Sequence, residues 1–183
     1  KMNREKTLRE RLEISHISRT EDLIKLFEHR ACDEDNCYEV FEENKECPII
    51  YDLGYYRDYG LSFDYVEEYT FSDQEEPYFR YQLSWGGPSE EYRIFTDEYY
   101  NIERVEYWFL DWFEGEYKTL DEDDIIFDII EDFKDISMLR DTKEWALLTE
   151  EERAVKKAEE RARLERYYKA MAELIRNDRQ EKG

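Results

Sequence analysis

Positive charge is scarce in the middle of this 183-residue chain. Residues 31–142 hold 33 Asp and Glu but only 8 Lys and Arg, an excess of 25 negative charges. The flanks lack this bias, since residues 1–30 carry 8 basic and 6 acidic residues and residues 143–183 carry 11 and 10. The excess argues against direct binding of nucleic acid or of an anionic membrane, because both are polyanions. It favours partners whose own surfaces are built to bind nucleic acid.

Long hydrophobic runs are also absent. No window approaches 18 uninterrupted apolar residues, so no membrane span is predicted. The basic residues near the start are not followed by the apolar stretch of a secretory signal. A cytoplasmic protein is therefore expected.

Cysteine and histidine are rare. The three cysteines, Cys32, Cys37 and Cys47, are odd in number and do not predict a disulfide framework. With His29 they could form a Cys3His zinc site, but the short Cys-x-x-Cys spacing of common zinc modules is missing. Reduced, partly buried thiols are the preferred interpretation, and no metal or cofactor is predicted.

Aromatic residues, by contrast, make up 16% of the chain. Disordered acidic tails are poor in aromatic residues because they build no core. The combination therefore predicts a folded body with a negatively charged surface.

The first 48 residues are predicted to be a helical segment. Leu8, Leu12 and Ile14 give a weak apolar face to a first helix. Thr20, followed by two acidic residues, resembles an N-cap that opens a second helix through Phe27.

From Leu61 the apolar period changes to two, which is typical of a half-buried strand. The expected strands run over residues 61–70, 77–85, 92–96 and 102–113, with turn signals at Gly86-Gly87-Pro88 and Gly115. Short consecutive strands with tight connections predict an antiparallel meander of about four strands.

Helical periodicity then returns. Thr119 or Asp121 is expected to cap a helix whose apolar stripe runs from Ile125 to Phe133 and could cover a sheet. Thr149, followed by three glutamates, predicts a long last helix over residues 150–178. The prediction is an α+β fold with an acidic, aromatic-rich core over residues 49–145 and a C-terminal helix over residues 146–183.

Two stretches in the strand region, YQLSWGGPSEEYRIF (81–95) and EYWFLDWF (106–113), resemble a segment of small acidic proteins from plasmids, phages and integrated elements. These proteins are associated with the neighbourhood of antirestriction and anti-CRISPR genes. The resemblance covers about residues 60–118 and implies a host-defence inhibitor. It implies no catalytic residue.

Carboxylates on the strands could imitate a row of phosphates. Residues i and i+2 of a strand lie on one face about 6.6 Å apart, a spacing of the same order as that of successive phosphates. An arginine pairs a carboxylate and a phosphate with the same bidentate geometry. The alternative is plain solvation of the sheet, but an excess of 25 is more than the roughly 2–8 charges that solubility requires. The residues predicted to contact a partner are Asp64, Glu68, Trp85, Glu90, Glu91, Asp97, Glu98, Glu114 and Glu116.

The turn at Trp85-Gly86-Gly87-Pro88-Ser89 is the best single candidate for a contact point. An exposed Trp beside flexible backbone would suit an interface anchor. The favoured interpretation is that Trp85 packs into the core, because Leu83 and Tyr81 alternate correctly for it. Glu90 and Glu91, at the same hairpin tip, are expected to lie on the surface.

An enzyme is the alternative from another class. Asp111, Glu116 and Lys118 give an acid followed by Glu-x-Lys, a pattern found in metal-dependent nucleases. The pattern is unspecific in a chain with 49 acidic residues. His16 and His29 lie beside charged residues on the expected N-terminal helices, so surface or capping roles are expected for them.

These patterns favour a non-enzymatic inhibitor that blocks a basic nucleic-acid-binding protein, such as a CRISPR or restriction effector. An immunity or antitoxin protein that plugs a basic nuclease toxin would use the same physics. The last helix could pair with a second copy to form a homodimer, or lie back on the domain. Its apolar residues are Leu164, Tyr167, Tyr168, Met171, Leu174 and Ile175.

Overall fold

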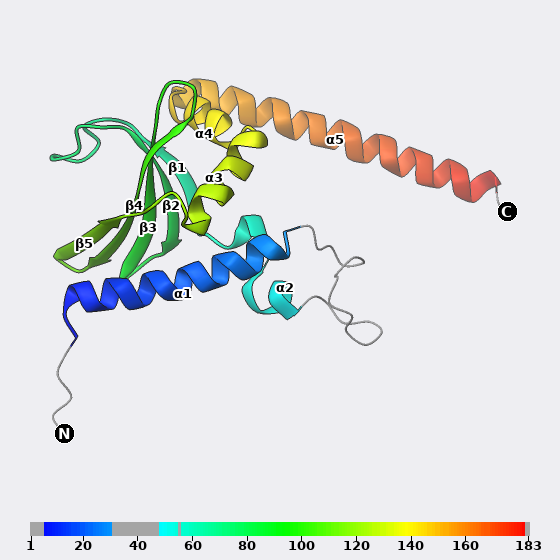
Figure 1. Ribbon diagram of the computed structural model, residues 1–183. Helices are drawn as coiled ribbons and strands as arrows, with labels where there is room; N and C mark the ends of the chain where they lie inside the picture. The colour runs from blue at the N-terminus through cyan, green and yellow to red at the C-terminus, as the bar shows by residue number, and fades with distance from the viewer. Residues whose placement is uncertain (1–5, 31–47, 55, 182–183) are drawn as a thin grey trace. The chain divides into compact units, whose positions relative to one another are not determined.

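Five antiparallel strands, in the order β1-β2-β3-β4-β5, form a meander in the computed structural model, which describes residues 6–30, 48–54 and 56–181 (Figure 1). The strands are β1 (Ser62–Val66), β2 (Tyr78–Ser84), β3 (Ser89–Thr96), β4 (Ile102–Asp111) and β5 (Glu114–Thr119). The helices are α1 (Leu8–Glu28), α2 (Pro48–Leu53), the 3-10 turn η1 (Tyr56–Asp58), α3 (Ile125–Asp135), α4 (Met138–Ala146) and α5 (Glu150–Glu181). The predicted α+β fold is confirmed.

One face of the sheet, the first face, builds the core. Alternate residues of β2, β3 and β4 point to it, among them Tyr81, Tyr92 and Tyr107, and their side chains are buried. Leu12 and Leu23 of α1, together with the apolar stripe of α3, pack into the same cluster. The other side of the sheet, the second face, carries the remaining residues of each strand.

The helix α1 is one continuous helix, so the prediction of two N-terminal helices is wrong. Thr7 caps it, with the side chain of Glu10 completing a capping box. Its buried residues, Leu12, His16, Leu23 and Leu26, continue a single stripe through the expected break at Thr20. Packing of that stripe outweighs the local cap signal.

The predicted meander of about four strands did not include the fifth strand, β5. Its residues are mostly polar, and on the first face Glu116 and Lys118 meet charged side chains of α1 instead of an apolar core. The α3 cap is also displaced from its predicted position, because Asp124 accepts a hydrogen bond from the Ile126 amide at 3.1 Å.

The chain divides into two compact units, residues 1–143 and 144–183. In the second unit, Thr149 and Glu152 exchange hydrogen bonds that begin α5, as the sequence predicts. Leu164, Tyr168, Met171 and Ile175 are exposed and follow one another at spacings of four, three and four residues. Pairing of two α5 helices stays a prediction.

Gly60, just before β1, lies directly against a buried ring. A Cβ atom there would come 2.1 Å from Cε2 of Tyr81. Tyr81 is 3% exposed and packs edge-on against Phe133, so its ring has little room to move. We expect Gly60→Ala to lower the free energy of unfolding by about 2 kcal/mol, measured by urea denaturation.

Gly115→Ala is the matched control for this prediction. There the Cβ would meet only the end of the Leu110 side chain, at 2.9 Å, which can rotate away. We expect a loss below about 1 kcal/mol. Equal losses for the two variants would contradict the close approach at Gly60.

Candidate protein-interaction surface

Exposed carboxylates gather at one end of the sheet, which we call the acidic end. The strand register pairs Val66 with Tyr78 and Thr96 with Ile102, so the β1–β2 and β3–β4 connections leave the sheet at this same end (Figure 1). Its exposed acids are Glu67, Glu68, Asp73, Glu75, Glu76, Glu98 and Glu103.

A row of acids on α3 continues the acidic end. Asp128, Glu131 and Asp135 are exposed and lie three and four residues apart, so they share the helix face opposite the buried stripe. Lys134 connects α3 with the β3–β4 turn, since its Nζ lies 3.0 Å from Oδ1 of Asn101. The row therefore adjoins the acids of the β3–β4 turn. Its members follow one another along α3 about one helical turn, or 5.4 Å, apart.

The cations near the acidic end have partners of their own. Arg104 donates to Glu76 at 2.7 Å and to Glu106 at 2.8 Å, and its guanidinium lies over the Phe95 ring. Lys134 pairs with Glu131 at 3.4 Å. These contacts neutralise part of the surface and leave most of its carboxylates facing solvent.

The structure brings three predicted contact residues, Glu68, Asp97 and Glu98, to the acidic end. Asp97 also shapes the β3–β4 turn, because it accepts hydrogen bonds from the Asn101 side chain, the Asn101 amide and the Tyr99 amide. These bonds, led by that of the Asn101 side chain, lower the pKa of the Asp97 carboxyl and keep it charged.

Three other predicted residues lie elsewhere. Asp64 stands on the second face and pairs with Arg80 at 3.1 Å. Glu114 and Glu116 belong to β5, which begins at the opposite end of the sheet. Glu116 pairs there with Arg9 of α1 at 3.4 Å. The nine residues therefore do not form one row.

Glu90 and Glu91 are not surface residues, and that expectation is wrong. They are 6% and 4% exposed. Glu90 faces α1, where it pairs with Arg19 and accepts a hydrogen bond from Ser15 at 2.7 Å. Glu91, on the second face, pairs with Arg93 at 2.7 Å. The strand begins at Ser89, so both glutamates lie inside the sheet and not at the hairpin tip.

Trp85 is 78% exposed, so the preferred interpretation of a core residue is also wrong. The β4–β5 turn at the same end of the sheet presents Trp112 and Phe113, which are 86% and 98% exposed. The two turns are close, since a Cβ on Gly87 would lie 3.0 Å from Nε1 of Trp112. Trp is a frequent interface anchor, so these aromatic tips are a second candidate contact.

The residues of the enzyme alternative meet three different residues of α1. Asp111 pairs with Arg11, Glu116 with Arg9, and Lys118 with Glu13. These ion pairs attach α1 to β4 and β5. Within the described ranges, no group of three or more His, Cys, Asp or Glu side chains is placed to hold a metal ion.

His16 is buried, contrary to the expected surface role. Its Nε2 lies 3.2 Å from Oδ2 of Asp124, and its ring lies 4.8 Å from that of Tyr107. Burial alone would raise the pKa of Asp124, but contacts with His16, the Ile126 amide and Lys118 outweigh burial and lower it. This pair joins α1 to the start of α3.

The zinc candidates Cys32, Cys37 and Cys47 lie outside the described residues. In the part of the chain that the structure describes, no helix has the length and hydrophobicity that a membrane span requires.

Some surface acids were not predicted as contact residues, although the sequence pattern that places them on the surface was present. Asp128, Glu131 and Asp135 follow from the same helical period that identified the α3 stripe. Trp112 and Phe113 gave no signal, because they extend an apolar strand pattern that the structure ends at Asp111.

Comparisons with known proteins add no further evidence. No protein-family model, no curated protein and no solved structure matches the chain.

Proposed function

We propose that this protein is a non-enzymatic inhibitor whose acidic end occupies the nucleic-acid-binding surface of another protein. The observation that carries the proposal is the gathering of exposed carboxylates from two strand connections and α3 at one end of the fold. The amino-acid composition alone does not require the exposed carboxylates to lie together at one end of the fold.

The physical basis is the equivalence of carboxylate and phosphate for an arginine. Guanidinium groups bind both anions in the same bidentate way, and a lysine responds to either as a point charge. A net charge of −22 gives the protein a long-range field that steers it to basic surfaces and repels competing nucleic acid.

A non-catalytic role is supported by the positions of the acid and lysine residues that resemble a nuclease pattern. Asp111, Glu116 and Lys118 each meet an oppositely charged side chain of α1. Their charges are therefore used in attaching α1 to the sheet.

The experiment is a cleavage assay with purified restriction and CRISPR effectors and basic nuclease toxins. We expect the protein to inhibit at least one of them. Its affinity should fall at least about 100-fold between about 50 mM and 500 mM salt, because the Debye length shrinks from above 10 Å to below 5 Å. Surface plasmon resonance would measure the affinity.

Each outcome has a definite meaning. Inhibition limited to the nuclease toxins would assign the immunity role instead of the effector role. An affinity that does not change with salt would rule out phosphate imitation and indicate an apolar interface, such as one at the aromatic tips.

A further inference from the structure

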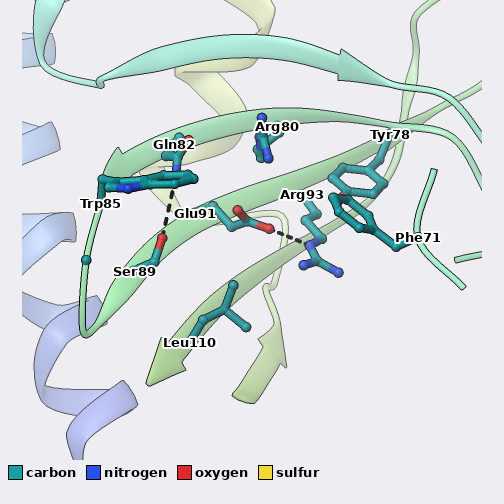
Figure 2. Close-up of a pocket in the computed structure, with 10 residues that line it drawn as sticks. Phe71, Tyr78, Arg80, Gln82, Trp85, Ser89, Glu91, Arg93 and Leu110 are labelled. Carbon is teal, nitrogen blue, oxygen red and sulfur yellow. Dashed lines mark hydrogen bonds and ion pairs between the residues drawn. The ribbon is translucent and has the colours of Figure 1, made fainter. Parts of the chain in front are cut away.

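A trough lies on the second face of the sheet, along β2 and β3 (Figure 2). Its volume is about 520 Å³. Its walls include Phe71, Tyr78, Arg80, Gln82, Trp85 and Arg93. Tyr78 and Ser84 lie six residue steps apart on β2, a length of about 20 Å at the rise of a strand. The trough is long enough for about six residues of extended peptide.

Exposed aromatic side chains stand at both ends of the trough. Trp85 lies at one end, and Phe71, which is 51% exposed, lies with Tyr78 at the other (Figure 2). Exposed aromatic rings beside a concave surface are typical of anchor points in protein interfaces.

Two arginines meet between these ends. Arg80 of β2 and Arg93 of β3 are direct cross-strand partners. Like charges in this position destabilise a sheet unless anions compensate them. Each arginine has one carboxylate partner, Asp64 at 3.1 Å and Glu91 at 2.7 Å. This leaves further guanidinium N–H groups for a ligand.

Two buried donors in the trough lack a hydrogen-bond partner in the described part of the chain. They are Nε of Arg80 and the hydroxyl of Tyr78, whose side chain is 2% exposed. Burial raises the pKa of Tyr78, so its hydroxyl stays protonated and able to donate. Buried donors without partners are costly, and two in one trough indicate a missing acceptor.

We propose that the trough binds an extended acidic segment of a partner protein. An Asp or Glu of that segment would lie between Arg80 and Arg93, with apolar side chains against Trp85 and Phe71. Side chains on one side of an extended peptide recur about every 6.6 Å, so the two apolar residues lie about six positions apart, with the acid between them. None of the carboxylates that define the acidic end lines the trough, so this proposal does not depend on the inhibitor function.

The test is selection from a phage-displayed library of random peptides on the immobilised full chain. We expect enrichment of sequences with an acidic residue between two apolar ones. Trp85→Ala and Arg80→Met should each lower the affinity for a synthetic copy of the selected peptide at least about 10-fold, as loss of an interface anchor does. Fluorescence anisotropy would measure the affinity.

Tyr99→Ala and Arg140→Met are the matched controls, since both residues are exposed and lie outside the trough. They should change the affinity by less than about 2-fold. Selection of no peptide, selection of peptides without an acidic residue, or unchanged binding by both trough variants would overturn the proposal. Trp85 is largely exposed, so Trp85→Ala decides the matter even if Arg80→Met fails to fold.

Discussion

The Glu90→Lys variant is expected to lose about 4 kcal/mol of unfolding free energy. Glu90 is buried between β3 and α1, where its carboxylate pairs with Arg19 and accepts a hydrogen bond from Ser15. Removal of one partner from a buried ion pair leaves an uncompensated charge, and a lysine adds a second cation beside the guanidinium. Urea denaturation followed by circular dichroism would measure the loss.

Glu98→Lys is the control, with the same charge change at an exposed position of the β3–β4 turn. It should stay within about 0.5 kcal/mol of the parent protein. If Glu90→Lys is as stable as the parent protein, Glu90 cannot be buried against α1 as the structure places it. An equal loss of unfolding free energy in both variants would mean that net charge, and not the local ion pair, controls stability.

The largest effect on function is expected from charge reversal at the acidic end. The triple variant Glu68→Lys, Glu75→Lys and Glu98→Lys alters three exposed side chains on the two neighbouring connections. Each close charge pair in a protein complex contributes about 1.5 kcal/mol or more, so binding to the inhibited target should weaken at least about 100-fold. The inhibition assay and surface plasmon resonance would both report it.

A matched variant separates local contact from the general field. Glu159→Lys, Glu160→Lys and Glu165→Lys make the same charge change on exposed positions of α5, in a region that is near neutral. The affinity of this variant should stay within about 5-fold of that of the parent, because the altered carboxylates are not among those of the acidic end and exposed charges without a direct partner contact are screened by salt. Equal weakening by both variants would show a diffuse field without contact at the acidic end, and weakening by the α5 variant alone would place the interface on α5.

Much of the fold was predictable because local patterns and tertiary packing agree. The alternation of apolar residues along β2 and β4 predicted the meander, and Thr149 with Glu152 predicted the start of α5. The continuous α1 was not predictable from Thr20, because a cap signal is local and the buried stripe gains its energy only from the sheet.

The candidate site was predictable only in part. Composition identified an acidic surface, and Glu68, Asp97 and Glu98 do lie together at one end of the sheet. The pattern did not distinguish them from Glu90 and Glu91, which have the same charge but are buried. A glutamate becomes a structural residue when an arginine from a distant element meets it, and such a pair leaves no periodic signal.

The sequence by itself determined the sign and location of the charge excess, the order of the strands and the presence of a long last helix, because composition and periodicity are local properties. Only the tertiary structure decided which carboxylates face solvent, which rings stand exposed at the hairpin turns, and that Arg80 and Arg93 are neighbours. Strand register and helix docking fix these features, and both depend on contacts between residues far apart in the chain.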